Sequence, residues 1–263
     1  MSNKTLVTII VIVLVLAGGT AAALYYHNNK PQDTASQDQP SSATPGGSVP
    51  LGQQDQQNNQ PTQPATTTPQ ATTTAQTMDN CTRDFDPNKL KTAQVNIKNR
   101  QVEIDVKDFG KVIVQLYDQD APKAVENFLR LVNSGYYDCL TFHRIAQGFV
   151  IQGGDPTGTG SGGDSAFGGP FADELNPDTP SYKAGYQHGV LAMANAGPNT
   201  NTSQFFIMLA DNDLPHNYTI FGKVVSGLNV VDKIGQVPIT PELGPTDGKP
   251  VTPVVMDKVT IIK

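Results

Sequence analysis

The stretch from Phe142 to Pro156 reads FHRIAQGFVIQGGDP and decides the fold. Its two short apolar runs flank Gly148, a pattern that predicts two strands turning back on each other. Successive side chains of a strand point to opposite faces of the sheet. We therefore expect Arg144 to share one face of the first strand with Phe142, leaving the other face to His143 and Ile145.

The second run, which follows Gly148, alternates in the same way. We expect Val150 and Gln152 to share one face, opposite Phe149 and Ile151. A pair of glycines then ends the strand, and the glycine-rich segment 157–169 predicts a surface loop.

Two further blocks follow this stretch along the chain. Residues 193–207 read MANAGPNTNTSQFFI, and residues 221–224 read FGKV. Together the three blocks resemble the signature of the cyclophilin family of peptidyl-prolyl isomerases, and the similarity covers Thr92 to Lys263. Three long motifs in the right order are far more specific than a single short glycine pattern. The resemblance is to an exported or membrane-anchored, bacterial-like member.

The remaining pattern predicts a mainly β domain. Apolar residues at helical spacing predict two helices, from Pro122 to Val132 and from Leu228 to Ile234. Many antiparallel strands with two helices fit a closed barrel. The resemblance implies an eight-stranded antiparallel barrel that is capped by these two helices. Besides the opening pair, strands are expected at 94–97, 102–106, 111–117, 189–193, 205–209, 218–225 and 254–262.

Charge and composition limit the class of partner. The chain has 263 residues, a net charge of −6 and no basic stripe, which argues against nucleic acid as the main partner. Its two cysteines and four histidines show no metal-ligand spacing, so we expect neither a metal nor a cofactor. The family resemblance implies proline-containing polypeptides as clients, and we expect a monomer.

The N-terminal region carries an apolar run from Leu6 to Tyr26. At about 1.5 Å per residue it would make a helix about 31 Å long, the thickness of a membrane hydrocarbon core. This predicts a transmembrane anchor at 1–30. A cleaved secretory signal is the alternative, because the small residues at 20–23 could form a cleavage site. Either way the rest of the chain is expected outside the cytoplasm, anchored to the membrane or secreted.

The segment 31–78 is rich in Gln, Thr and Pro and almost free of charge. Such a composition cannot bury enough apolar surface to offset the entropy lost on ordering. We expect a disordered linker there, followed by a cyclophilin-like isomerase domain at 79–263.

The two cysteines, Cys81 and Cys139, are an even pair in a chain that is expected to be exported. Cys139 stands where the family usually has glycine. We predict a disulfide between them, tying the segment that leads into the domain to the barrel.

The reaction that the resemblance implies is rotation about an Xaa-Pro amide. Its uncatalysed barrier is about 18–20 kcal/mol, because the C–N bond has partial double-bond character. Catalysis needs a donor near the proline nitrogen, whose lone pair localises as the amide twists. Arg144 has this role by similarity, since arginine is permanently charged and rich in donors. Gln152 would orient Arg144 and the peptide.

The other site residues are carried over by their positions in the motifs. By similarity, four residues would line the proline pocket: Phe149, Val150, Phe206 and Leu214. Three more would hold the extended substrate backbone: Ala194, Asn195 and Gln204. Tyr218, which replaces a histidine of the family, is also expected to contact the substrate.

Two departures from the family pattern concern ligand preference. Val150 replaces a common methionine, and Asp213 lies nearest the position of a tryptophan that binds the peptide ligand cyclosporin in sensitive members. The chain has no tryptophan, so weak cyclosporin binding is expected. Two other functions stay open from sequence alone: a module that binds proline segments with little turnover, and a surface interaction protein.

Overall fold

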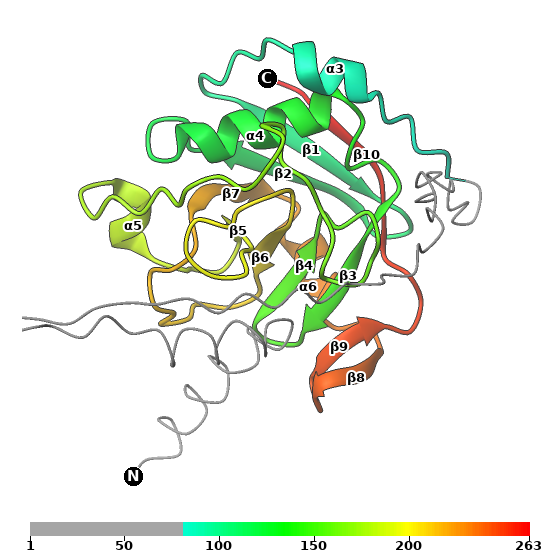
Figure 1. The fold of residues 1–263 in the computed structure, drawn as a ribbon. Coiled ribbons are helices and arrows are strands. Elements are labelled where there is room, and N and C mark those ends of the chain that lie inside the picture. The colour runs from blue at the N-terminus through cyan, green and yellow to red at the C-terminus, as the bar shows by residue number, and fades with distance from the viewer. Residues whose placement is uncertain (1–80) are drawn as a thin grey trace, which may run out of the picture.

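The protein is described here by a computed structural model that covers residues 81–263 (Figure 1). In this part of the chain, ten strands form one antiparallel sheet. In sheet order they are β10 (Val255–Ile261), β1 (Gln101–Val106), β2 (Gly110–Leu116), β7 (Ile220–Ser226), β5 (Val190–Met193), β6 (Phe205–Met208), β4 (Val150–Gly153), β3 (Leu140–Ala146), β9 (Asp247–Pro250) and β8 (Ile239–Gly244).

The sheet closes on itself between β10 and β3. Strand β10 pairs with β1 along its length and also with β3, where Val255 lies opposite Thr141 and Met256 opposite Leu140. Eight strands therefore form a closed antiparallel barrel, as predicted. Strands β9 and β8 extend from β3 as a hairpin outside the barrel (Figure 1).

The two predicted helices are α4 (Pro122–Asn133) and α6 (Leu228–Ile234). Proline at the first position starts α4, and the carboxylate of Glu174 accepts hydrogen bonds from the backbone N–H groups of Lys123 and Ala124. Two short helices were not predicted, α3 (Pro87–Thr92) and α5 (Pro180–Ala184). Each is too short to show a helical period, although each begins with a proline.

The barrel interior is filled by aromatic and branched side chains. Phe128 of α4 lies edge-on to Phe205 and Phe221, with ring centroids 5.5 and 5.3 Å apart. Alternate residues of the same strands point outward instead: Phe205 is in the interior cluster, whereas Phe206 belongs to a second apolar cluster. The barrel wall thus separates a closed core from an apolar outer surface.

The predicted strand at 94–97 is absent, since these residues have no ladder partner. Val95 and Ile97 still pack against the core. Both edges of the neighbouring strand β1 are already occupied, one by β2 and the other by β10. No edge of β1 is therefore left for the segment 94–97 to pair with.

The predicted faces of β3 are wrong at one point. Phe142 and Ile145 both lie in the interior cluster, whereas Arg144 reaches the outer side chain of Gln152. The register between β3 and β4 shifts between Phe142 and Arg144, so one extra residue, His143, is inserted. Such a β-bulge reverses the alternation and directs Arg144 outward.

The alternation in β4 holds for Val150 and Gln152, which face outward, and for Ile151, which faces the core. Phe149 was predicted on the side of Ile151, but it packs on the outer cluster with Val150. It lies in the turn before β4, where the alternation of a strand does not apply.

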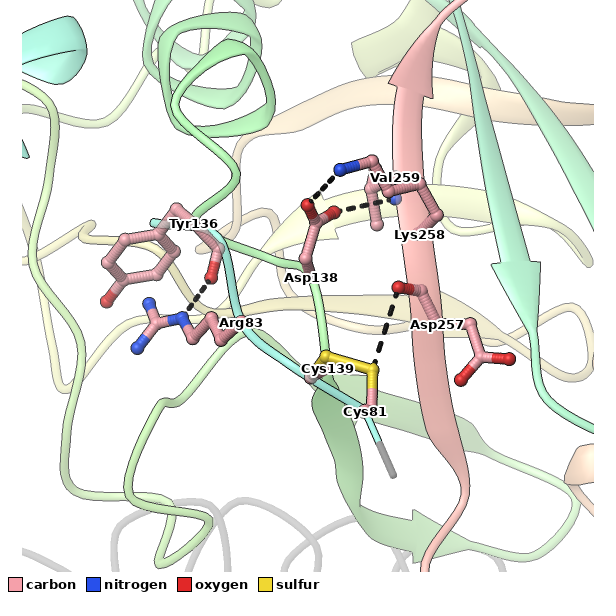
Figure 2. Close-up of a disulfide and its surroundings, with 8 residues drawn as sticks. All are labelled: Cys81, Arg83, Tyr136, Asp138, Cys139, Asp257, Lys258 and Val259. Atoms are coloured by element: carbon pink, nitrogen blue, oxygen red, sulfur yellow. Dashed lines mark hydrogen bonds and ion pairs between the residues drawn. A yellow bond between two sulfur atoms is a disulfide. The ribbon is translucent and has the colours of Figure 1, made fainter. Parts of the chain in front are cut away.

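Cys81 and Cys139 form a disulfide, with their Cα atoms 5.7 Å apart (Figure 2). It attaches the first described residues to the turn between α4 and β3. The buried carboxylate of Asp138 holds the same turn to β10, because it accepts hydrogen bonds from Lys258 Nζ and Val259 N at 2.6 and 3.0 Å. Cys139 has a positive φ of 62°, which explains why glycine suits this position in the family.

The predictions for residues 1–30 and 31–78 fall outside the described residues. Within 81–263, no helix is both long enough and apolar enough to cross a membrane.

Candidate active site

The second apolar cluster lies on the outer face of strands β3 to β7. It brings together six residues that the sequence predicted for the substrate site: Phe149, Val150, Ala194, Phe206, Leu214 and Tyr218. Val150 and Phe206 are almost fully buried, with 2% and 6% of their surface exposed, and the other four are half-buried around them. Cross-strand neighbours β4 and β6 carry the two buried side chains.

A chain of polar side chains runs beside this cluster. Arg144 donates from Nη1 to Gln152 Oε1 at 2.9 Å, and Gln152 donates from Nε2 to Gln204 Oε1 at 2.9 Å. Gln204 in turn donates to the carbonyl oxygens of Gly160 and Gly162. The structure therefore places the predicted Arg144, Gln152 and Gln204 in one hydrogen-bonded row, and the amide orientations are fixed from end to end.

The loop at the end of this row is organised by one carboxylate. Asp155 accepts hydrogen bonds from the backbone N–H groups of Thr157, Thr159, Gly160 and Gly162. Burial acts to raise the pKa of Asp155, but these hydrogen bonds outweigh it and lower the pKa below its usual value. The carboxylate is thus charged at neutral pH, and the predicted surface loop keeps a fixed shape next to Gln204.

The aromatic wall of the cluster is formed by Phe206 and Tyr218, whose rings meet edge to face at 5.5 Å. Tyr186 fixes the backbone of Tyr218, donating to its carbonyl oxygen at 2.8 Å and accepting from its N–H at 3.0 Å. Burial raises the pKa of Tyr218, and the nearby charge of Arg144 partly opposes that rise. Tyr218 therefore stays neutral and lies within electrostatic reach of Arg144.

Asn195 closes the other side of the site. Its Nδ2 donates to the carbonyl oxygen of Asn217 at 2.9 Å, which ties the segment after β5 to the segment before Tyr218. The preceding residue, Ala194, donates its N–H to the carbonyl oxygen of Gln204. These two hydrogen bonds hold Asn195 beside Asn217, and hold Ala194, a member of the cluster, beside Gln204.

His143 lies next to Arg144 in β3 and is buried. It is 6% exposed, and burial lowers its pKa to about 4. The ring is therefore neutral at pH 7 and adds no charge beside Arg144.

Sequence reasoning missed two residues of this region, Tyr186 and Asp247. Asp247 binds Arg144 through both carboxylate oxygens, at 2.8 Å from Nε and 2.6 Å from Nη2. The segment 235–253 matches none of the three motifs. Its Asp247–Gly248 pair is a turn signal in sequence, but in the structure the turn lies at 245–246 and Asp247 begins β9. Tyr186 carries no sequence signal that separates it from a core aromatic residue.

A pocket of 560 Å³ lies next to the site and not within it. Tyr117, Val190 and Ile220 of the outer cluster line it together with α5, and none of the predicted site residues does. The predicted site residues form a buried to half-buried apolar cluster flanked by polar side chains.

Comparisons with known proteins agree with this geometry. The family described as "Cyclophilin type peptidyl-prolyl cis-trans isomerase/CLD" matches residues 101–261. The peptidyl-prolyl cis-trans isomerase ppi1 of Schizosaccharomyces pombe is 53% identical over 129 residues, which cover 49% of this chain and 81% of the relative. The human peptidyl-prolyl cis-trans isomerase-like 1 is 48% identical over 139 residues, which cover 52% of this chain and 81% of that protein.

A solved structure shows the same fold. The cyclophilin type isomerase of Cryptosporidium parvum is 37% identical, with a TM-score of 0.56, and covers 63% of this chain and 98% of its own. These relatives are eukaryotic, and their names refer to neither a membrane nor export, so the narrower bacterial-like assignment stays a prediction. The barrel, the family match and the curated relatives show that the chain belongs to the cyclophilin family and is a cyclophilin-type peptidyl-prolyl cis-trans isomerase.

Proposed function

We propose that Arg144 is the catalytic group of this isomerase and that the outer cluster around Phe206 binds the proline ring. The observation that carries the proposal is the row Arg144–Gln152–Gln204, which holds a guanidinium at the edge of the apolar surface. A bound proline on Phe206 would bring its nitrogen toward that guanidinium. The five N–H donors of arginine suit a lone pair that forms only in the twisted state.

The site needs no covalent step for this reaction. Twisting the amide breaks the conjugation between nitrogen and carbonyl, and a donor to the nitrogen stabilises the twisted form more than either planar form. Apolar contacts from Phe149, Phe206 and Leu214 would hold the ring while the preceding carbonyl moves. Backbone groups near Ala194 and Asn195 would hold the rest of the peptide in place.

We further propose that the clients are exported proteins and that the domain works outside the cytoplasm, held to the membrane by the Leu6–Tyr26 run. The Cys81–Cys139 disulfide supports this setting, because such bonds persist in oxidising compartments and are rare in the cytosol. The linker 31–78 would give the domain reach: about 50 flexible residues span roughly 40 Å.

Protease treatment of intact cells tests the location. We expect an external protease to cut within the linker 31–78 and release an active domain, while a cytosolic marker protein stays intact. The mature N-terminus, read by mass spectrometry, separates a retained anchor from a cleaved signal. Full-length protein recovered from the cytosol with both thiols free would contradict the proposed location and leave the isomerase assignment untouched.

Cyclosporin is expected to bind weakly to this enzyme. The exposed Asp213 lies nearest the position of the family's tryptophan, and an ionised carboxylate can only accept hydrogen bonds. Losing one buried donor contact reduces affinity by about 10- to 100-fold. The measurement is a titration of isomerase activity with the drug, and Asp213→Trp should increase its potency. Inhibition of the parent at the potency typical of tryptophan-containing members would contradict this prediction.

A further inference from the structure

The guanidinium of Arg144 is held by a carboxylate that comes from outside the barrel. Asp247 binds it in a bidentate pair, and the two side chains are only 15% and 16% exposed. With the bond to Gln152, three of the five N–H donors are engaged and two remain for a ligand. A two-point planar contact fixes the orientation of a guanidinium and not only its position.

The hairpin β8–β9 sets the place of this carboxylate by backbone contacts. Asp247 lies opposite Ala146 on β3, and Gln147 donates its N–H to the carbonyl oxygen of Thr246 at 2.8 Å. The next residue is Gly248, where a Cβ atom would collide with the carbonyl oxygen of Thr240. Asp247 therefore stands on a closely packed ladder and not on a free loop tip.

We infer that Asp247 is a positioning residue for isomerisation, which acts by holding Arg144 in the orientation that donates to the proline nitrogen. The inference rests on the role proposed for Arg144. Without the carboxylate, one hydrogen bond to Gln152 would still hold the guanidinium, but its plane could rotate about that contact. Each catalytic cycle would then have to order the long side chain again.

The carboxylate also reduces the positive potential at the site, which by itself would slow the reaction. Two facts make orientation the larger effect. The twisted amide presents a lone pair on nitrogen and not a full negative charge, so the Coulomb effect of Asp247 on it is small. A hydrogen bond prefers an angle above about 150° and weakens steeply below about 120°, so loss of orientation acts directly on the transition state.

The test compares Asp247→Ala with the parent enzyme in the full-length chain, using a proline peptide at saturating and limiting concentrations. We expect kcat to fall about tenfold, within the range that misplaced catalytic groups cause, and KM to change less than about twofold. Asp247→Asn keeps one acceptor, so its kcat should lie between that of the parent and that of Asp247→Ala. Glu242→Gln removes the same charge from an exposed position of the same hairpin, and is the matched control that should keep the parent kcat.

A double-mutant cycle with Arg144→Ala separates positioning from a general structural effect. If Asp247 acts through Arg144, adding Asp247→Ala to the Arg144→Ala variant should not lower kcat any further. The same tenfold loss in both backgrounds would overturn the inference, as would an unchanged or increased kcat in the single variant. If Asp247→Ala unfolds the hairpin, Asp247→Asn takes its place in the cycle. An Arg144→Ala variant with parent activity would instead overturn the proposed role of Arg144.

Discussion

Replacing Arg144 by alanine is expected to lower kcat/KM about 100-fold or more, the loss that follows when one preorganised donor to a transition state is removed. This is the largest effect on activity that the site predicts. The twisted amide would lose its donor, whereas the apolar surface around Phe206 would still bind the proline ring. Peptide affinity should therefore fall much less than kcat.

The fold should survive this change. Arg144 and Asp247 are partly exposed, so water can hydrate the carboxylate that is left behind. Arg144→Lys keeps the charge but loses the planar two-point contact, and should recover only part of the activity. Lys111→Ala removes an exposed cation from another strand of the barrel and is the matched control. Parent activity in a folded Arg144→Ala variant would show that another group is responsible.

Removing the disulfide is expected to have the largest effect on stability. Cys81 and Cys139 are 58 residues apart, and closing a loop of this size restricts the unfolded chain by about 4 kcal/mol in the loop-entropy account. The double variant Cys81→Ala, Cys139→Ala should lower the free energy of unfolding by about that amount. Urea unfolding of the parent and the variant, compared through midpoints and slopes, measures the difference.

A second variant separates the bond from the backbone at this position. Because Cys139 has a positive φ of 62°, glycine should fit there with less strain than alanine. Cys81→Ala, Cys139→Gly should therefore be more stable than the alanine pair by about 1 kcal/mol. Equal stability of the two variants would contradict this account of the backbone. Two free thiols in the unfolded, unreduced parent would contradict the disulfide itself.

The barrel and most of the site could be predicted because the three motifs lie on its walls. The first motif contains β4 and most of β3, and the other two contain most of β6 and the centre of β7. The motif residues that share the outer face therefore also share a cluster. Strand alternation alone could not have predicted which residues share the outer face. It placed Phe142 and Arg144 on one face, because nothing in the sequence marks the extra residue that forms the bulge at His143.

The features that were missed depend on contacts distant in sequence. Asp247 is 103 residues from Arg144, and only the pairing of β9 with β3 brings them together. The segment 94–97 has the alternating pattern of a strand, but it forms none, because both edges of β1 are already paired. Short helices such as α3 and α5 have no measurable period. In each case the tertiary partner, which a local pattern does not contain, decides the outcome.

The most direct test of the account is the rate of cis–trans exchange in an Ala-Pro-containing peptide, followed by NMR exchange spectroscopy with catalytic amounts of the full-length protein. Uncatalysed exchange takes tens to hundreds of seconds. We predict that the parent protein accelerates it into the range that exchange spectroscopy detects, and that Arg144→Ala binds the peptide without doing so. Peptide signals that shift on binding while the exchange rate stays uncatalysed would contradict the account and favour a proline-binding module.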